Sequence, residues 1–579
     1  MTGALRLTWV QPEDLVGHEL RQAAEDGRDA AGIAAVWRAA GGPCAPPAAG
    51  ASPAPAAPAL RALADRLLDE LAALPAPLAA LEPTDLPAIR AACPDWPAPP
   101  ARPAHRAPDP AITREPAPPA AQEPDPAIAQ EPAVSTRAAL ASSVTPASPV
   151  TPTAPASGTD HRTASRPPAP APAPTPAPAP APAQPPPPPN RSSAHAVVVS
   201  HLVVPPPVVS AAGVPAADRA GISPAGAGLT VEALHAAWLG RAAGCLLGKP
   251  VEKLPLHGIR ALARATGNWP LRTWFTAEGL PAELARAHPW NRRSAPTSLA
   301  ENIDGMPEDD DLDYPLLNLL LLQRYGRGFR TADVARLWLD ELPAGRAFTA
   351  ERVAYRNLLS GIEPPLTALR RNPFREWIGA AIRADVHGWT CPGDPGAAAE
   401  QAHRDATLTH TANGVHSAMF VAAAIASAAG GGVDVHGALA AGLAVVPPRS
   451  RLARAVRLGI EEARAEDRFD AVVDRLHSVY GDCHWVHAVP NAALLAAALT
   501  HADGDFTGSI CRAVSGGWDT DSNGATAGSL AGLLAGRPDA LPRRWTEPLR
   551  NRLATSVGGF DGIGFDALAR LTHQEALRP

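Results

Sequence analysis

The chain has 579 residues, of which 68 are proline and 47 glycine, and this content excludes regular helix or sheet over much of its length. Alanine supplies much of the 46% hydrophobic fraction and aromatic residues reach only 4%, so the core must rest on close backbone approach and small side chains. The net charge of −6 comes from interspersed signs without a lysine or arginine tract, which argues against a dedicated nucleic-acid-binding surface.

Three further features of the sequence bear on the cellular compartment of the protein. The six cysteines lie far apart and form no CxxC pair, which is typical of reduced thiols in a cytosol. The N-terminal sequence turns acidic before any apolar run develops, so no secretory signal peptide is predicted. The most apolar stretch, residues 418–429, is shorter than the roughly 20 residues of a membrane span, and we interpret it as a buried core helix. We therefore expect a cytoplasmic protein without a membrane partner.

Residues 1–93 contain two helical patterns. The second pattern, PALRALADRLLDELAAL, places five leucines on one helix face, namely Leu60, Leu63, Leu67, Leu68 and Leu71. A region of this size with few large apolar side chains would make a weak core alone. We predict a small helical N-terminal region that packs either on the rest of the chain or on a partner.

Residues 94–228 are dominated by proline, alanine and serine, and residues 171–189 read APAPTPAPAPAPAQPPPPP. Such a sequence favours an extended polyproline conformation without a hydrogen-bonded ladder. We predict a disordered Pro/Ala-rich linker over this range. The alternative is a specific ligand for proline-recognising modules.

Helical spacing resumes at Thr230, an expected N-cap with Glu232 in the first turn, and continues almost to the C-terminus without period-two alternation or a βαβ rhythm. Glycine recurs at every fourth position in two of these helices, at Gly240, Gly244 and Gly248 in the first and at Gly524, Gly528, Gly532 and Gly536 in the second. Because residues four apart share a helix face, each strip lets another helix approach closely. We predict an all-α, Gly/Ala-rich compact helical bundle over residues 229–579.

The first acidic cluster stands just before an apolar helical run and consists of Glu308, Asp309, Asp310, Asp311 and Asp313. Consecutive carboxylates repel each other. A helix N-terminus relieves some of that repulsion, and a divalent cation such as magnesium or calcium relieves far more because it requires hard oxygen ligands. The cluster is therefore either a solvated acidic helix start or part of a metal site.

A second acidic cluster follows about 210 residues later and again opens a helix, with Asp519, Asp521 and Ser522 placed after the flexible pair Gly516–Gly517. Taken alone, this segment could be an Asx turn that caps the helix. Its Asp-x-Asp core is also similar to the aspartyl-phosphate motif of haloacid-dehalogenase phosphatases. That motif needs a hydrophobic strand before it, and CRAVSGG is a poor strand, so the phosphatase interpretation is disfavoured.

Together with a third element, GRAAGCLLGKPVE, the two clusters resemble the ADP-ribosylglycohydrolase family. In this all-helical family an early glycine-rich helix ends in a Gly-x-x-x-Glu segment, a central Asp-Asp run starts another helix, and a late Asp-x-Asp-Thr/Ser stands before a Gly/Ala-rich helix. All three elements occur here in that order, and the resemblance covers about residues 230–575. The chain is most similar in pattern to a bacterial branch that bears an EDDD motif.

The resemblance implies a dinuclear magnesium site whose two ions are held by Asp309, Asp310, Asp311, Asp519, Asp521 and Ser522. It further implies that Glu252 handles a proton or positions water, with Asp310 also at the catalytic centre. The candidate substrate ligands are His410, Asn413, Gly517 and Trp518, and His487 and Asn491 are weaker candidates of the same kind. For the histidines and for Trp518 the alternative is a purely structural role.

Three positions depart from the family pattern. Asp309 stands where many relatives have threonine or serine, which adds negative charge and bears on metal preference. Leu312 replaces the threonine of the usual Asp-Asp-Thr, so a hydroxyl is missing beside the site. Cys245 replaces an aspartate found in other branches, which puts any role of that position in doubt. None of the three changes removes a core carboxylate.

The activity implied by the resemblance is magnesium-dependent hydrolysis of the glycosidic bond of ADP-ribosyl conjugates, with release of ADP-ribose. The implied partner is an ADP-ribosylated protein or another ADP-ribosyl conjugate. Two alternatives stay open at this point. The chain could hydrolyse another N- or O-ribosyl metabolite, or it could be a non-catalytic module that binds ADP-ribose while its N-terminal helices and tether recruit partners.

Overall fold

Helices dominate the computed structural model, which describes residues 9–46, 49–99 and 228–578. These residues form no β-strand and contain three isolated β-bridges, so the predicted all-α fold class is confirmed for the described part of the chain. Most of the predicted linker, residues 94–228, lies outside the described residues. Its disorder therefore stays a prediction.

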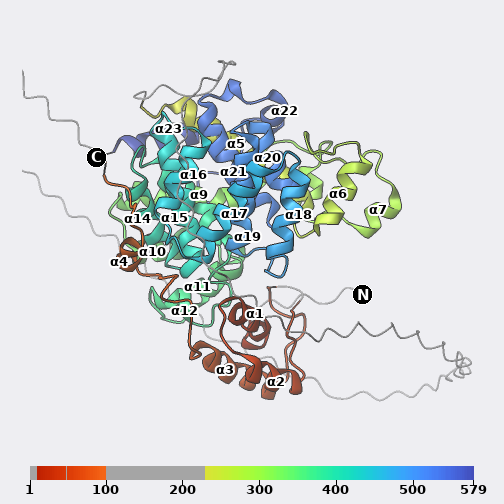
Figure 1. Cartoon of the computed structure of the whole chain (residues 1–579), viewed down its shortest axis with the longest axis vertical. Coiled ribbons are helices and arrows are strands. Elements are labelled where there is room, and N and C mark those ends of the chain that lie inside the picture. The colour runs from red at the N-terminus through yellow and green to blue at the C-terminus, as the bar shows by residue number, and fades with distance from the viewer. Residues whose placement is uncertain (1–8, 47–48, 100–227, 579) are drawn as a thin grey trace, which may run out of the picture. The chain divides into compact units, whose positions relative to one another are not determined.

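The N-terminal segment, by which we mean residues 9–99, contains four helices: α1 (Pro12–Glu25), α2 (Ala31–Ala39), α3 (Pro58–Ala72) and α4 (Leu86–Ala92) (Figure 1). α1 begins at a proline, whose missing N–H costs nothing at the first helical position. The leucine stripe predicted from the sequence lies on α3, where Leu67, Leu68 and Leu71 are buried and Leu60 and Leu63 are partly buried. The leucine stripe of α3 is therefore covered by other parts of the protein.

The helical domain, residues 228–578, holds the remaining helices. Its first half comprises α5 (Val231–Gly248), α6 (Leu256–Ala265), α7 (Ala282–Ala287), α8 (Ala295–Ser298), α9 (Asp310–Tyr325), α10 (Thr331–Glu341), α11 (Thr349–Leu359), α12 (Leu366–Leu369) and α13 (Asp385–Trp389). Its second half comprises α14 (Pro395–Ala406), α15 (Ala412–Ala429), α16 (Val435–Ala444), α17 (Arg451–Ala465), α18 (Phe469–Tyr480), α19 (Ala488–Ala502), α20 (Phe506–Ser515), α21 (Thr520–Ala535), α22 (Arg543–Thr546) and α23 (Phe565–Leu577). Short 3₁₀ turns link several of them, at Lys249–Val251, Ala344–Arg346, Ile378–Arg383, Pro538–Ala540 and Glu547–Leu549.

The two glycine strips predicted from the sequence face each other across α5 and α21. A Cβ atom at Gly244 would lie 1.8 Å from the carbonyl oxygen of Gly524, and one at Gly240 would lie 2.1 Å from that of Gly528. The backbones of the two helices are therefore in direct contact. Because the helices run antiparallel, the C-terminal end of α5 at Gly248 meets the N-terminal end of α21.

A buried arginine of α5 ties this helix to the start of α9. Arg241 of α5 is fully buried, and its Nε donates to the carbonyl oxygen of Asp311 at 2.7 Å. Its Nη1 donates to Asp385 Oδ2 at 2.6 Å, at the start of α13. The N-termini of α9 and α21 thus both lie at the glycine-rich end of α5.

α15 (Ala412–Ala429) is the one described helix that is long and apolar enough to cross a membrane by length and composition. In the structure 89% of that stretch is buried inside the protein. The interpretation of residues 418–429 as a buried core helix is therefore confirmed.

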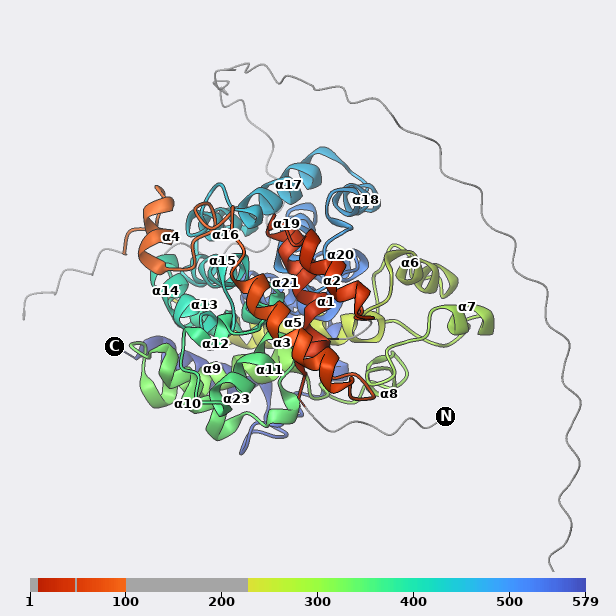
Figure 2. The ribbon, with the colours of Figure 1, turned by 90° about the horizontal axis from the view of Figure 1, so that it is seen from below.

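The N-terminal segment packs on the helical domain, which is one of the two positions expected for it. Figure 2 shows α1 and α3 lying against this domain, and both belong to one compact unit with it. Arg375 pairs with Glu19 at 2.9 Å and with Asp26 at 2.8 Å. Arg451 Nη2 pairs with Glu82 Oε2 at 2.6 Å. The contacts are ionic as well as apolar.

Candidate metal and active site

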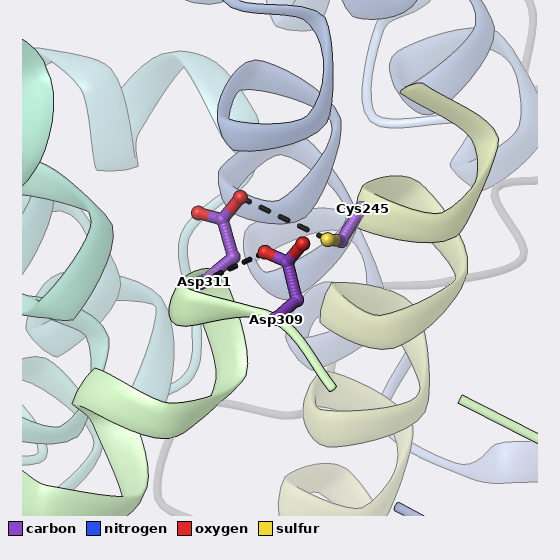
Figure 3. Close-up of side chains that lie close together, drawn as sticks. All are labelled: Cys245, Asp309 and Asp311. Atoms are coloured by element: carbon purple, nitrogen blue, oxygen red, sulfur yellow. Dashed lines mark hydrogen bonds between the residues drawn. The ribbon is translucent and has the colours of Figure 1, made fainter. Parts of the chain in front are cut away.

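The two acidic clusters meet in space although they lie far apart in the sequence. Ser522 Oγ of α21 donates to Asp311 Oδ2 of α9 at 3.4 Å. One ligand atom each from Cys245, Asp309 and Asp311 lies within 4.8 Å of the other two. Figure 3 shows these three side chains pointing toward one another from the ends of α5 and α9. The structure therefore gathers donor groups from three helices at one place.

The helix starts explain why the carboxylates lie where they do. Asp309 is the N-cap of α9, and its Oδ1 accepts the backbone N–H of Asp311 at 3.0 Å. Asp519 occupies the N-cap position of α21, and Thr520 Oγ1 holds that helix start to the carbonyl oxygen of Gly248 at 2.9 Å. The partial positive charge of each helix N-terminus favours the carboxylates gathered there.

The crowding of carboxylates changes their acidity. Burial and repulsion from Asp309 raise the pKa values of Asp310 and Asp311 well above the usual range. Such shifts arise because removal from water and nearby like charge both disfavour the ionised form. A bound cation would favour the ionised form and so oppose both effects, and these carboxylates could therefore serve as its ligands.

Two cations of the protein itself face the cluster. Lys249 contacts Asp309, and although burial disfavours its charge, this contact holds the pKa of Lys249 above its usual value. Arg241 Nη2 lies 3.4 Å from Asp311 Oδ1, while Nη1 of the same side chain pairs with Asp385. The carboxylates outnumber these cations, and carboxylate and hydroxyl oxygens are the hard ligands that Mg²⁺ prefers. The donor set therefore fits a divalent cation.

Glu252 faces the same cluster from the segment that follows α5. Asn291 Nδ2 donates to its Oε2 at 2.6 Å, and Lys253 Nζ lies 2.7 Å from its Oε1. Burial and repulsion from Glu252 raise the pKa of Asp521 to about 7, and Glu252 also contributes to the raised pKa of Asp519. The Glu252 side chain keeps 18% of its exposure, so it is in contact with water beside the cluster.

The turn that leads into α21 carries two predicted substrate ligands. Gly517 and Trp518 both have positive φ, at 79° and 54°, which is unusual for a large side chain. The Trp518 ring stacks on His477, with centroids 3.8 Å apart and planes at 6°. His477 in turn donates from Nε2 to the carbonyl oxygen of Gly516 at 2.8 Å. These contacts give Trp518 a structural role in this turn, and its contact with substrate stays a prediction.

The other two predicted substrate ligands lie among buried polar networks. His410 is fully buried, its Nδ1 lies 2.6 Å from Thr409 Oγ1 and 3.9 Å from Glu351 Oε1, and burial lowers its pKa well below the usual value. Asn413 is also fully buried, and its Nδ2 donates to Glu376 Oε2 at 2.8 Å. None of these contacts joins either residue to the acidic cluster. A structural role is the simpler interpretation, and substrate binding by these two residues stays a prediction.

Asn491 has a larger part in the site than its sequence pattern suggested. Its Oδ1 accepts the backbone N–H of Asp519 at 3.0 Å and Nδ2–H of Asn523 at 2.7 Å. Its own Nδ2 donates to the carbonyl oxygens of Trp485 at 2.9 Å and His487 at 2.8 Å. Asn491 therefore holds the second acidic cluster to the loop before α19.

Two hydroxyls beside the first cluster were not predicted from the sequence. Ser556 Oγ donates to Asp313 Oδ2 at 2.8 Å, and Thr555 Oγ1 donates to Oδ1 of the same residue. Burial raises the pKa of Asp313 to about 6 against the effect of these hydroxyls. With Leu312 in place of the usual threonine, hydroxyl groups reach this helix from a remote segment instead. No local pattern around residues 555–556 points to this role.

The thiol of Cys245, the third departure from the family pattern, lies inside the cluster. Its Sγ is 3.8 Å from Asp311 Oδ2. Burial and the carboxylates of Asp309 and Asp311 raise its pKa well above the usual value, so the thiol is neutral and adds no charge. An aspartate at this position would have added one more negative charge.

Comparison with known proteins agrees with the three motifs. Residues 229–577, more than half of the chain, match the family model described as ADP-ribosylglycohydrolase, and the chain therefore belongs to this family. Among solved structures, one described as "ADP-ribosylglycohydrolase-related protein complex" is similar at 22% identity, with a TM-score of 0.38, over 60% of this chain and 99% of that chain. No curated protein matches the chain. Membership in the family assigns the helical domain to a class of glycosidases.

Proposed function

We propose that the chain is a magnesium-dependent hydrolase that cleaves the glycosidic bond of ADP-ribosyl conjugates and releases ADP-ribose. The observation that carries the proposal is the approach of α21 to α9, seen in the contact between Ser522 and Asp311. Family membership supports ADP-ribosyl conjugates as the substrate class. The EDDD sequence at Glu308–Asp311 supports assignment to the bacterial branch that carries this motif. Reduced thiols support a cytoplasmic location.

We further propose that the metal site takes two Mg²⁺ ions. Their ligands are Asp309, Asp310, Asp311, Asp519, Asp521 and Ser522. Raised carboxylate pKa values and hard oxygen donors support this assignment, because both are expected where a cation completes the site. When bound to these residues, the ions would supply Lewis acidity beside the distal ribose.

Glu252 is the proposed acid–base residue. Water attacks the anomeric carbon of the distal ribose, a carbon–oxygen bond forms, and the bond from that carbon to the linked nitrogen or oxygen breaks. The proton lost by water passes to Glu252 and then to the leaving group, so the reaction consumes one water molecule. Asn291 and Lys253 fix the Glu252 carboxylate at hydrogen-bond distance on both oxygens, which keeps it aimed at the cluster.

The full-length protein tests this proposal. ADP-ribosylated proteins and free ribosides are incubated with the chain and Mg²⁺, and released ADP-ribose or ribose is measured by chromatography. In Asp521→Asn we expect turnover to fall by about a hundredfold or more, because one anionic ligand is lost. The matched control is Asp434→Asn, since Asp434 is an exposed N-cap of α16 and asparagine caps helices equally well.

Each outcome bears on a different claim. Wild-type activity in Asp521→Asn would reject the assigned site. Release of ribose from free ribosides, with none from ADP-ribosylated protein, would favour a metabolite hydrolase instead. Calorimetric binding of ADP-ribose without turnover in the wild type would favour a binding module.

A further inference from the structure

The loop between α18 and α19, residues 481–487, is held on one side by the N-terminal segment. Glu25, the last residue of α1, accepts the backbone N–H of His484 at 3.3 Å through Oε1. Its Oε2 lies 3.6 Å from His487 Nε2. His487 Nδ1 accepts the backbone N–H of Val489 at 3.2 Å, so the ring proton is on Nε2 and faces Glu25. One carboxylate of α1 thus reaches two residues of this loop.

Aromatic and backbone contacts also fix the same loop against α1 and the residues around Trp377. The His484 ring stacks on Trp377, with centroids 4.1 Å apart and planes at 12°. His18 of α1 packs edge-on against both rings, with centroids 6.4 Å and 6.1 Å away. The backbone N–H of Ile378 donates to the carbonyl oxygen of Val486 at 3.0 Å. The α18–α19 loop is therefore enclosed between α1 and the residues around Trp377.

On its other side the loop reaches the active site through Asn491. This side chain binds the carbonyl oxygens of Trp485 and His487 and accepts the backbone N–H of Asp519. Because amide hydrogen bonds of this kind are directional, a shift of the loop changes the position of the helix start that carries Asp519.

A second route leads from the same loop to Glu252. Lys253 Nζ lies 5.5 Å from the ring centroid of Trp485, a cation–π distance, and pairs with Glu252 at 2.7 Å. The α18–α19 loop therefore supports a partner of each proposed functional group, the metal ligand Asp519 and the acid–base residue Glu252.

The end of α1 is itself held rigidly on the helical domain. Arg451 Nη1 donates to the carbonyl oxygen of Glu25 at 2.9 Å, while its Nη2 pairs with Glu82 and Glu376 at 2.6 Å and 2.9 Å. Arg375 pairs with Asp26, the C-cap of α1, at 2.8 Å. Such buried, multiply bonded ion pairs fix geometry because each lost partner leaves an unpaired charge.

From these contacts we infer that the N-terminal segment is a positioning element of the active site, and that Glu25 is a positioning residue acting through the α18–α19 loop on Asp519 and Glu252. This inference rests on the proposed function. The family model begins at residue 229, so the matched region does not include this element. The segment then serves catalysis from within the same chain, in place of the partner-recruiting role considered from the sequence.

Substitutions at Glu25 separate positioning from stability in the full-length chain. Glu25→Ala removes the acceptor for His484, so we expect kcat to fall by about ten- to a hundredfold with KM changed by less than about threefold. Glu25→Gln keeps a carbonyl acceptor and should restore kcat to within about threefold of wild type. Glu25→Asp keeps a carboxyl group but withdraws the acceptor, and should resemble Glu25→Ala. The matched control is Glu13→Ala, which breaks a pair with Arg61 inside the N-terminal segment and should leave kcat unchanged.

Two readouts do not depend on turnover. Hydrogen exchange in the peptide covering residues 481–491 should become faster in Glu25→Ala and Glu25→Asp but not in Glu25→Gln or Glu13→Ala. Calorimetry with Mg²⁺ alone should show weaker binding in the same two variants, because Asp519 is displaced. Faster exchange with wild-type kcat and Mg²⁺ affinity would overturn the inference, since the contact would then be merely structural.

The design also separates this inference from the proposed function. A wild-type chain that releases no ADP-ribose contradicts the proposed function, and the calorimetric comparison of the same variants then decides the inference alone. An active wild type with equal kcat and equal Mg²⁺ affinity in Glu25→Ala contradicts the inference and leaves the proposed function intact. A wild type without turnover or Mg²⁺ binding contradicts both.

Discussion

Two interfaces position the proposed active site, and they are built on opposite principles. Between α5 and α21 the backbones touch at paired glycines, with Gly244 facing Gly524 and Gly240 facing Gly528. No side chain separates the two helices at these points, so their spacing is set by backbone atoms that cannot move aside. This interface brings the C-terminal end of α5 to the second acidic cluster.

The interface between the N-terminal segment and the helical domain is held by charge. Arg375 pairs with Glu19, Arg451 pairs with Glu82 and Glu376, and a solvent-open pocket of about 700 Å³ lies among these residues and apolar side chains. Leu68, Leu74 and Leu366 are among the residues that line this pocket. The contact is therefore specified by hydrogen-bonded ion pairs and leaves space unfilled.

The difference predicts how each interface fails. A backbone-to-backbone contact tolerates no added volume, because the helices must separate along their whole length to admit one carbon atom. An ionic contact with spare volume tolerates changes of size but loses stability when one buried charge loses its partner. Volume changes should break the first interface and charge changes the second.

The largest expected effect is on the glycine contact. In Gly244→Ala the new Cβ would lie 1.8 Å from the carbonyl oxygen of Gly524, so α5 and α21 must separate. We expect a loss of more than about 4 kcal/mol in the free energy of unfolding, measured by chemical denaturation. The control is Gly32→Ala in α2, where a Cβ meets nothing within 4 Å and helix propensity favours alanine by up to about 1 kcal/mol. Wild-type stability in Gly244→Ala would contradict the close backbone contact.

The second effect tests the ionic interface. Arg451→Met leaves Glu82 and Glu376 without their shared partner, and we expect a loss of about 3 to 5 kcal/mol in the free energy of unfolding. Arg370→Met is the control, because the pair between Arg370 and Asp69 lies at the edge of the same interface with both side chains half exposed. Its loss should stay below about 1 kcal/mol. Equal losses of stability in Arg451→Met and Arg370→Met would contradict this prediction, because the buried ion pairs would then stabilise the fold no more than the exposed one.

The smallest effect is a pH dependence at Glu25. Burial raises its pKa from 4.5 to about 7, against the backbone N–H of His484 and the charges of Arg21 and Arg451, and with a small contribution from Asp26. The folded chain therefore keeps a proton that the unfolded chain loses above pH 4.5. The contribution of Glu25 to the free energy of unfolding should fall as the pH rises from 4.5 to 7 and should level off above 7.

Glu25→Gln checks this dependence because glutamine does not ionise. The stability of the variant relative to wild type should increase between pH 5 and pH 8, by about 2 kcal/mol in the free energy of unfolding. Burial lowers the pKa values of His484 and His487 to about 3, so both rings gain their proton in the folded state far below this window. These two histidines therefore contribute about equally to the pH dependence of stability in wild type and in Glu25→Gln. Their contribution largely cancels when the free energies of unfolding of the two proteins are subtracted. A stability difference that is the same at pH 5 and pH 8 would contradict the raised pKa of Glu25.

The acidic helix starts of the proposed site were predicted from sequence as far as local signals reach. The acidic residues before α9 and α21 stand at helix starts, and a helix start is a local feature that residue order determines. Asn291 and the hydroxyls of Thr555 and Ser556 carry no such signal. They act because the packing brings remote loops beside Glu252 and Asp313.

The sequence by itself determined the helical periodicity, the glycine strips of α5 and α21 and the chemistry of the acidic helix starts. These follow from repeats of three to four residues and from short motifs, which the order of residues expresses directly. Only the tertiary structure decided that the two strips face each other, and that Glu25 holds a loop 459 residues further along the chain. Such pairings depend on which surfaces bury each other best, and that choice is made by the packing of the whole chain.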